Sequence, residues 1–568
     1  MHTRRALLQI STLSLPLLWA LSALSQTAPS PAARRPNIIF IMSDDHAYQA
    51  ISAYDDRLIQ TPNIDRIAQQ GMRFNHAGVT NSICAPSRAT ILTGKHSHLN
   101  GKVDNHFEFD TSNVTFPQLL QQHGYQTAMF GKLHFGNSPK GFDQYKILPG
   151  QGAYYNPEFI TKKDGNIRLE GYVTDIVTDM TLDWLEKERN PEKPFLLMYL
   201  HKAPHRAWLP AERHLDAFTQ RVFPEPKTLF DDYSGRSSPA KEAEMNILKH
   251  MSWAGDNKLF PETMDALGLP EIGFDKKRYE AEFARLNPSQ RANFTKAYGK
   301  VNEAFLKSYS SMSPEDLMRW KYQRYMQDYL ATVQAVDENV GRLLDYLEKN
   351  DLLENTLLVY TSDQGFYLGE HGWYDKRFVY DESFKTPLLL SWPNRVPAGS
   401  QCDELVQNLD FAQTFLEAAG VKAPKDMQGE SLVPLLTGKV SQLKRKALYY
   451  HYYEYPAEHM VNRHYALINK DYKLIHYYYA VDEWELIDRQ KDPYELKNVY
   501  HDPAYAQVRK KLHRELDALR TKYKDNDQIS AQYIDRFLGD AAQGKVFGLP
   551  SGKAVNMQRE RRRKTMDD

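Results

Sequence analysis

The chain has 568 residues, 42% of them hydrophobic and 25% charged, and its 72 lysines and arginines equal its 72 aspartates and glutamates in number. Because this length exceeds what one hydrophobic core usually organises, we expect at least two domains. The balanced charge excludes a general attraction to nucleic acid or to anionic membranes, so any preference for anions has to come from a local site. Two cysteines, Cys84 and Cys402, are too few for a disulfide framework, and we expect Cys402 to be a packed residue.

The first 25 residues have the pattern of a secretory signal peptide. Arg4 and Arg5 precede an apolar segment, Ala6–Ser25, that ends in small residues. This segment is too short and too polar for a membrane-spanning helix, and neither a second apolar span nor a lipid-attachment cysteine follows it. We therefore predict a secreted or periplasmic protein without a membrane anchor, exported by the general secretory route or by the twin-arginine route. Residues 26–35 are predicted to be a linker.

Beyond the linker, short apolar strands alternate with amphipathic helices. Strand patterns cover Asn37–Ser43, Gln126–Phe130, Phe195–Leu200, Thr356–Thr361 and Pro387–Trp392, and helical patterns cover Pro62–Gln70, Phe116–His123, Val173–Lys187 and Trp320–Glu348. This alternation predicts a doubly wound α/β domain over residues 36–443. The charged segment at about residues 210–318 carries aromatic residues at helical spacing, and we interpret it as a helical insertion whose aromatic residues pack in a core.

Polar side chains follow several of these strands directly. Asp44 and Asp45 come after the first strand, and His134, His205 and Asp363 each follow a later one. The carboxyl ends of parallel strands meet at one edge of a sheet, where α/β proteins bind ligands. Two adjacent acids at the end of a buried strand are costly unless a cation neutralises them or the turn is solvated, and this segment alone leaves both readings open.

Cys84 begins the run Cys84-Ala85-Pro86-Ser87-Arg88 at the start of a predicted helix. A lone cysteine can also be a small buried apolar residue, and the pentapeptide by itself leaves this alternative open. Arg88 lies one helical turn after Cys84, so we expect the two side chains on the same face of the helix.

Taken together, these segments resemble the type I sulfatases of the alkaline phosphatase superfamily. The matching blocks stand in the usual order of that family: Asp44-Asp45, Cys84 to Arg88, Gly131 to His134, Ala203 to His205, Ser362 to Gly365, Leu368 to Gly372 with Lys376, Trp484 to Asp488 and Lys491 to Leu496. The resemblance covers roughly residues 36 to 525. It is closest to sulfatases of glycans, such as those acting on glycosaminoglycans or algal polysaccharides.

The resemblance implies an alkaline-phosphatase-like doubly wound sheet with a smaller C-terminal antiparallel-sheet subdomain. We place this subdomain at residues 444–530, where short strand patterns precede an amphipathic helix, and we predict a solvated tail over 531–568. A tyrosine cluster marks the subdomain, and it fits either stacking on sugar rings or packing within a half-buried sheet: Tyr449, Tyr450, Tyr452, Tyr453, Tyr477, Tyr478 and Tyr479.

The resemblance also implies the reactive groups. In the family, the cysteine at the position of Cys84 is oxidised to Cα-formylglycine (3-oxoalanine) by a formylglycine-generating or an anaerobic sulfatase-maturating enzyme. The hydrated aldehyde then attacks the sulfur of a sulfate ester. The implied metal ligands are Asp44, Asp45, Asp363, the amide oxygen of Gln364 and the modified Cys84, an all-oxygen set that suits one Ca²⁺ better than Mg²⁺. Many relatives have Asn or His in place of Gln364, but glutamine keeps an oxygen ligand.

Further roles carry over by position. Arg88 would hold the hydrate and the acids of the metal site, and Lys132 and Lys376 would contact sulfate oxygens. His134 would accept a proton from the hydrate, and His205, together with Lys376, would protonate the leaving alcohol. The candidates for substrate binding are Arg206, His371, Arg377, Arg463 and His464.

The sequence thus predicts a sulfatase that hydrolyses sulfate esters of a sulfated carbohydrate, removing them from chain ends during polysaccharide degradation. Its expected partners are the sulfated glycan and the maturation enzyme, without nucleic acid. Two alternatives stay open: a hydrolase of phosphate mono- or diesters from the same superfamily, and a non-catalytic protein that binds sulfated glycans.

Overall fold

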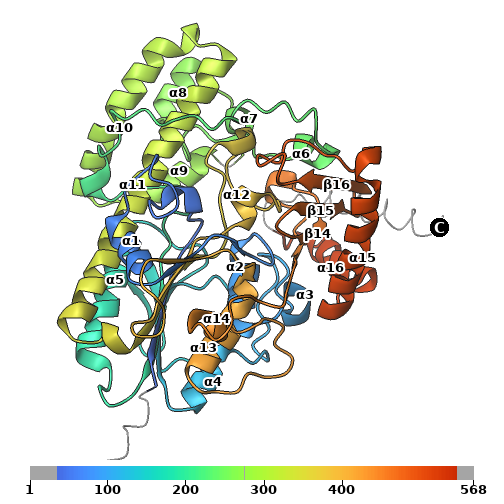
Figure 1. The fold of residues 1–568 in the computed structure, drawn as a ribbon. Helices are drawn as coiled ribbons and strands as arrows, with labels where there is room; N and C mark the ends of the chain where they lie inside the picture. The colour runs from blue at the N-terminus through green and yellow to red at the C-terminus, as the bar shows by residue number, and fades with distance from the viewer. Residues whose placement is uncertain (1–34, 274, 547–568) are drawn as a thin grey trace, which may run out of the picture. The chain divides into compact units, whose positions relative to one another are not determined.

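A mixed ten-stranded sheet organises the computed structural model, which describes residues 35–273 and 275–546 (Figure 1). The expected signal peptide, residues 1–25, and all of the linker except Arg35 lie outside the described residues. Across the sheet, the strands are β11 (Ser400–Cys402), β2 (Met72–Phe74), β10 (Leu388–Ser391), β9 (Thr356–Ser362), β1 (Asn37–Ser43), β8 (Phe195–Leu200), β4 (Gln126–Lys132), β5 (Gln144–Leu148), β6 (Glu158–Thr161) and β7 (Gly165–Arg168).

The centre of this sheet is parallel, as the alternation of strands and helices predicts. Strands β9, β1, β8, β4 and β5 run in the same direction. Strands β10 and β6 run antiparallel to both of their neighbours, so the sheet is mixed rather than fully parallel. The α/β fold class is confirmed, and the parallel centre brings the carboxyl ends of β1, β4, β8 and β9 to one edge.

Helices cover both faces of the sheet because the central strands are apolar on both sides. In β1, Ile38 and Phe40 point into one core, and Ile39 and Ile41 point into the other. The first core includes residues of α2 (Cys84–Thr93), α4 (Phe116–Gln122), α13 (Phe411–Ala418) and α14 (Val433–Leu436), and the second includes residues of α1 (Pro62–Gln69), α5 (Val173–Asp183) and α11 (Pro314–Lys349). Figure 1 shows these two sets on opposite sides of the sheet.

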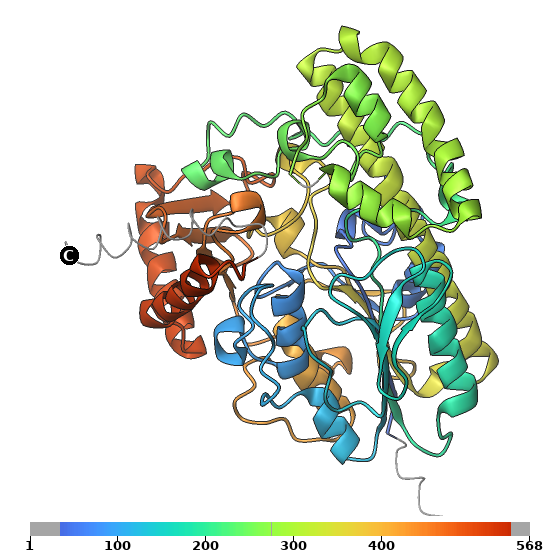
Figure 2. The ribbon, with the colours of Figure 1, turned by 180° about the vertical axis from the view of Figure 1, so that it is seen from behind.

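The segment 210–318 forms the expected insertion, although residues 215–237 within it contain no α-helix. Its helices are α6 (Ser238–Glu242), α7 (Ile247–His250), α8 (Pro261–Leu267), α9 (Asp275–Ala284) and α10 (Pro288–Ser308), and the first turn of α11 follows. Phe294, Tyr298 and Phe305 are buried, so these aromatic residues pack in cores as predicted. Before α6, the backbone N–H of Ser237 donates to Glu485 of the C-terminal sheet, and Figure 2 shows α6, in green, against that sheet.

A four-stranded antiparallel sheet forms the C-terminal subdomain. It comprises β13 (Leu448–Tyr452), β14 (His464–Ile468), β15 (Tyr472–Tyr477) and β16 (Glu483–Asp488), and it packs against α15 (Ala506–Tyr523). Five members of the tyrosine cluster are fully buried, so they pack in the interior of the subdomain rather than stack on sugars: Tyr449, Tyr450, Tyr452, Tyr453 and Tyr477. Further short elements include α3 (Ser97–Asn100), α12 (Asp381–Phe384) and the paired strands β3 (Ala77–Gly78) and β12 (Val406–Gln407).

The structure corrects the predicted boundary of the tail. Helix α16 (Asp527–Ala542) continues past residue 531, and Ile534, Phe537 and Leu538 on its apolar face are buried against Val103 and Phe107. The spacing of these apolar residues is helical, a signal that the charged residues around them mask. Residues 547–568 lie outside the described residues. Among the helices of residues 35–273 and 275–546, none combines the length and the hydropathy needed to cross a bilayer.

Phe537 tests whether α16 belongs to the folded core. Its side chain is 1% exposed and faces Phe107 and the guanidinium of Arg463. We expect Phe537→Ala to lower the free energy of unfolding by about 3 kcal/mol, because truncation leaves a cavity. Denaturant titration measures this change. Gln532→Ala, an exposed position on the same helix, is the control and is expected to stay within about 0.5 kcal/mol of wild type. If Phe537→Ala were as stable as Gln532→Ala, α16 would not be part of the folded core, and the predicted solvated tail would stand.

Candidate active site

The polar residues that follow β1, β4, β8 and β9 meet at one edge of the sheet, together with the first turn of α2. Carboxylate oxygens of Asp44, Asp45 and Asp363 all lie within 4.8 Å of one another, and all three side chains are buried. Asp44, Cys84 and His205 form a second group with the same spread of ligand atoms. The strand topology therefore brings together residues that are far apart in the chain.

This carboxylate group has the chemistry of a cation site. Three buried carboxylates repel one another, and a divalent ion is the usual way in which proteins stabilise them. Gln364 donates from Nε2 to Asp45, whereas its Oε1 is buried without a hydrogen-bond partner. An amide oxygen left in this state beside three carboxylates is the donor that a hard cation takes as a further ligand. The predicted metal ligands thus fit a divalent cation.

The pKa values of the acids reflect burial and the charges beside them. Burial acts to raise the pKa of Asp44, but Lys132, His205 and Arg88 more than offset it, so its pKa lies well below the ordinary value. Burial raises the pKa of Asp45 to about 6 against the opposing effect of Lys376. Burial and the neighbouring Asp44 raise the pKa of Asp363 to about 7. A bound divalent cation would stabilise the ionised form of both raised groups.

Two basic residues connect the acids to the rest of the site. Arg88 donates from Nε to Asp363 at 2.9 Å and from a terminal nitrogen to Asp44 at 3.2 Å, and its other terminal nitrogen reaches the carbonyl of Lys132. Lys132 donates to Asp44 and also to Gln151. Arg88 therefore lies one turn from Cys84 and contacts the acids, as the motif predicts.

Cys84 is the first residue of α2, a helix in which all ten residues are buried. Burial raises the pKa of its thiol, so the unmodified side chain is a neutral thiol and a poor nucleophile. The amino-terminal end of a helix carries partial positive charge, which favours an anion at this position. The hydroxyl group of Ser87 donates to the carbonyl of Asp363 and accepts from the side-chain amide of Asn408, and these bonds connect the start of α2 to the end of β9.

Lys132 occupies the last position of β4, and Gly131 makes this possible. Gly131 pairs with Leu200 of β8, and a Cβ at its position would lie 1.7 Å from the Leu200 carbonyl oxygen. With a φ of +107°, the residue also adopts a backbone conformation that side chains disfavour. Glycine at this position therefore allows β4 to run alongside β8 up to Lys132.

Lys376, His205 and His134 complete the candidate catalytic set. Lys376 Nζ lies 2.6 and 2.7 Å from the two carboxylate oxygens of Asp45, and His205 Nε2 lies 3.7 Å from that carboxylate. His205 Nδ1 is 2.6 Å from the carbonyl of Arg206, so Nδ1 donates and Nε2 is left to exchange a proton. Burial, assisted by Lys132, keeps the pKa values of His134 and His205 well below the ordinary value. His134 Nδ1 has no hydrogen-bond partner.

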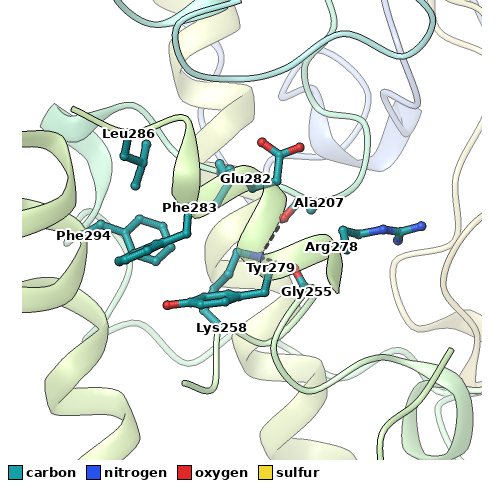
Figure 3. Close-up of a pocket in the computed structure, with 10 residues that line it drawn as sticks. Ala207, Gly255, Lys258, Arg278, Tyr279, Glu282, Phe283, Leu286 and Phe294 are labelled. Atoms are coloured by element: carbon teal, nitrogen blue, oxygen red, sulfur yellow. Dashed lines mark hydrogen bonds between the residues drawn. The ribbon is translucent and has the colours of Figure 1, made fainter. Parts of the chain in front are cut away.

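The insertion holds the segment that follows His205. Lys258 donates to the carbonyl of Ala207 at 2.7 Å and to that of Gly255 at 3.0 Å, as the dashed lines of Figure 3 show. The same figure shows an adjoining pocket lined by aromatic residues of the insertion, among them Phe283 and Phe294. Asp256 accepts two hydrogen bonds of 2.6 Å from Arg206. The insertion is thus part of the support of the site.

Of the five substrate-binding candidates, the structure brings two to the site. Arg206 follows His205 directly, and Arg377 follows Lys376 and contacts Asp375 and Glu454. The other three candidates are buried, as Arg377 is, but their contacts are with residues of the subdomain and of the loop before α12. His371 is fully buried and lies near Asp231, Arg236 and Glu382. Arg463 donates to the carbonyl of Tyr455. His464 stacks on Tyr450. Their side chains stabilise the subdomain and the loop before α12.

Sequence reasoning missed several residues at this site. His459 Nε2 lies 3.3 Å from Asp375, and Glu458 lies beside Arg206 and Arg377. Both belong to a short 3-10 segment, η8 (Glu458–Met460), that follows β13 and carries no recognisable motif. Gln151, which contacts Lys132, lies in the loop between β5 and β6. Asp375 could have been noticed, because it precedes Lys376 in the matching block.

Comparison with known families decides what kind of protein this is. The sequence model of the sulfatase family matches residues 36–421, more than half of the chain. The chain belongs to the sulfatase family. A second model, described as the C-terminal part of N-sulphoglucosamine sulphohydrolase, matches residues 369–522. The resemblance is therefore confirmed, and this sulfatase is a sulfuric ester hydrolase rather than a phosphate esterase or a non-catalytic binding protein.

Individual relatives agree with the family. The N-acetylglucosamine-6-O-sulfatase of Bacteroides thetaiotaomicron is 49% identical over 538 residues, which cover 93% of this sulfatase and 94% of the relative. The human N-acetylglucosamine-6-sulfatase is 28% identical over 433 residues, 71% of this chain and 65% of that protein. A solved structure of a protein in complex with its substrate D-glucosamine-2-N,6-O-disulfate aligns with a TM-score of 0.83 at 48% identity, covering 87% of this chain and 99% of that one.

The carboxylate group predicts a metal dependence. We expect the purified wild-type protein to carry about one divalent ion per chain, and Asp45→Ala and Asp363→Ala to lose it together with activity. Elemental analysis measures the metal, and circular dichroism shows that the variants are folded. Asp337→Asn is the control, because Asp337 is a buried acid elsewhere that accepts from the backbone of Ile64. Wild-type metal content in both alanine variants would refute the assignment of the ligands.

Proposed function

We propose that this sulfatase removes the 6-O-sulfate group from glucosamine residues at the ends of sulfated glycans. The observation that carries the proposal is 49% identity over 93% of the chain to an N-acetylglucosamine-6-O-sulfatase. The neighbour that was solved with D-glucosamine-2-N,6-O-disulfate supports the same sugar. The terminal mode is supported by the proximity of the insertion to the subdomain, where Arg278 of the insertion lies 4.0 Å from Glu458 of the subdomain.

We further propose that Cys84 is oxidised to Cα-formylglycine and that the metal is Ca²⁺. The start of α2, the adjoining Arg88 and the four oxygen donors favour these two groups. The hydrated formylglycine would supply the hydroxyl that attacks the sulfur of the ester, and a cation held by Asp44, Asp45, Asp363 and Gln364 would make that hydroxyl more acidic. The oxidation requires a maturation enzyme of the formylglycine-generating or the anaerobic type. The amino-terminal segment further leads us to propose export to the periplasm or the medium.

The protein side chains then bind the ester and move protons. Lys132 forms an ion pair with Asp44, and Lys376 forms one with Asp45. The ammonium group of each lysine can also donate to sulfate oxygens. His205 Nε2 gives a proton to the leaving alcohol, together with Lys376. The bound ester brings negative charge beside His205 and thereby raises the pKa that burial lowers. His134, neutral and without a partner at Nδ1, accepts the proton that is released when sulfate departs.

Cys84 is the test of the nucleophile. We expect Cys84→Ala to fold and to lose activity by about 10⁴-fold or more, because no other side chain supplies the attacking hydroxyl. In wild-type protein produced with a maturation enzyme, peptide mass spectrometry is expected to show residue 84 lighter than cysteine by about 18 Da. Cys402→Ala is the matched control, because Cys402 is packed on β11 in the sheet. Substantial turnover by purified Cys84→Ala would disprove the mechanism.

The sugar specificity is tested with a panel of defined compounds. The panel contains oligosaccharides with terminal or internal 6-O-sulfated glucosamine, the 4-epimer 6-O-sulfated galactosamine, an aryl sulfate and an aryl phosphate. We expect kcat/KM for terminal 6-O-sulfated glucosamine to exceed the other values by about 100-fold, and released sulfate with product sizing measures it. Turnover of the aryl sulfate without any glycan would reject the carbohydrate assignment. Removal of sulfate from internal residues would reject the terminal mode.

A further inference from the structure

Glu458 is an exposed acid in an unusual position at the mouth of the site. It is the first residue of η8, and its side chain is 53% exposed. Arginine residues from three separate parts of the chain point at its carboxylate. Arg206 approaches to 3.5 Å, Arg377 to 3.8 Å and Arg278 to 4.0 Å. An isolated surface ion pair joins one acid to one base, whereas three arginines converge on this carboxylate.

The three arginines are prepared to hold an anion at this point. Asp256 binds Nε and one terminal nitrogen of Arg206, which leaves the other terminal nitrogen facing Glu458. Asp375 and Glu454 bind Arg377 in the same way and leave its second terminal nitrogen facing Glu458. The guanidinium groups are thus fixed by other acids, and each offers N–H donors to a shared position.

Arg278 differs from the other two arginines. It comes from α9 of the insertion and is 34% exposed, and Figure 3 shows its guanidinium directed away from the aromatic residues of the adjoining pocket. Its distance of 4.0 Å from Glu458 is longer than a hydrogen bond. Arg278 is therefore free to follow an anion that enters from solvent, whereas the buried Arg206 and Arg377 are not.

We propose that Arg206, Arg278 and Arg377 form a subsite for a second sulfate group of the substrate sugar, and that the Glu458 carboxylate occupies this subsite in the free enzyme. The chain connects the subsite directly to the candidate catalytic residues, because Arg206 follows His205 and Arg377 follows Lys376. All contacts of Glu458 with the arginines are 3.5 Å or longer, so a sulfate with more oxygens can replace it. This inference rests on the proposed function and names a 2-N-sulfate on 6-O-sulfated glucosamine as the second group.

The selectivity ratio tests the subsite. It is kcat/KM for D-glucosamine-2-N,6-O-disulfate divided by kcat/KM for N-acetylglucosamine-6-O-sulfate. We expect Arg278→Ala to lower this ratio by about 5-fold or more, because a charge-assisted contact with the second sulfate is lost. Glu458→Gln is expected to raise the ratio by about 3-fold or more, because the competing carboxylate is neutralised while its shape is kept. Lys276→Ala removes the same charge from α9 at a residue that pairs with Asp265, and it is expected to leave the ratio unchanged.

The outcomes separate this inference from the proposed function. If both sugars are hydrolysed and neither Arg278→Ala nor Glu458→Gln changes the ratio, the subsite is refuted and the function stands. An equal change with Lys276→Ala would show a general charge effect and would also refute it. If neither sugar is hydrolysed, the proposed function fails, and calorimetric binding of both sugars to Cys84→Ala decides the subsite. Tighter binding of the disulfate that Arg278→Ala removes would support it, and equal or absent binding would overturn it.

Discussion

The burial of three carboxylates at one point is the constraint on which the rest of this structure depends. Asp44, Asp45 and Asp363 lie within 4.8 Å of one another without contact with solvent. An uncompensated buried charge costs several kcal/mol, so the fold has to supply opposite charges at fixed positions. Arg88, Lys132 and Lys376 do so. Three cations balance three carboxylates, and a bound divalent ion would leave the site positive toward an anionic ester.

This constraint explains why the elements around the site are so completely buried. All ten residues of α2 are inaccessible, because the helix has to bring both Cys84 and Arg88 to the acids. The close passage of β4 along β8 at Gly131 likewise serves to bring Lys132 to Asp44. Packing, and not charge alone, holds the charged side chains of such a site in position. In a low-dielectric interior, a small displacement can turn a strong attraction into a strong repulsion.

The insertion and the C-terminal subdomain hold residues that lie next to the candidate catalytic residues in the chain. Asp256 and Lys258 of the insertion hold Arg206 and the carbonyl of Ala207, directly after His205. Glu454, just after β13 of the subdomain, holds Arg377, directly after Lys376. Both accessory parts therefore position residues that neighbour the catalytic candidates. Variation in these parts can change the groups around the substrate without changing the carboxylates, which is how one fold serves several substrates.

The sequence by itself determined the family, the α/β class and the residues of the central site, because these are local signals. Apolar runs of strand length end directly before Asp44 and Asp363, and Cys84 and Arg88 lie one helical turn apart. Only the tertiary structure decided which of the candidate basic residues pack in the subdomain and the neighbouring loops. His371, Arg463 and His464 are polar in sequence, yet the subdomain and neighbouring loops bury them. Glu458, His459 and Gln151 reach the site from loops without a motif, since contacts between distant segments follow from packing and leave no periodic pattern in the chain.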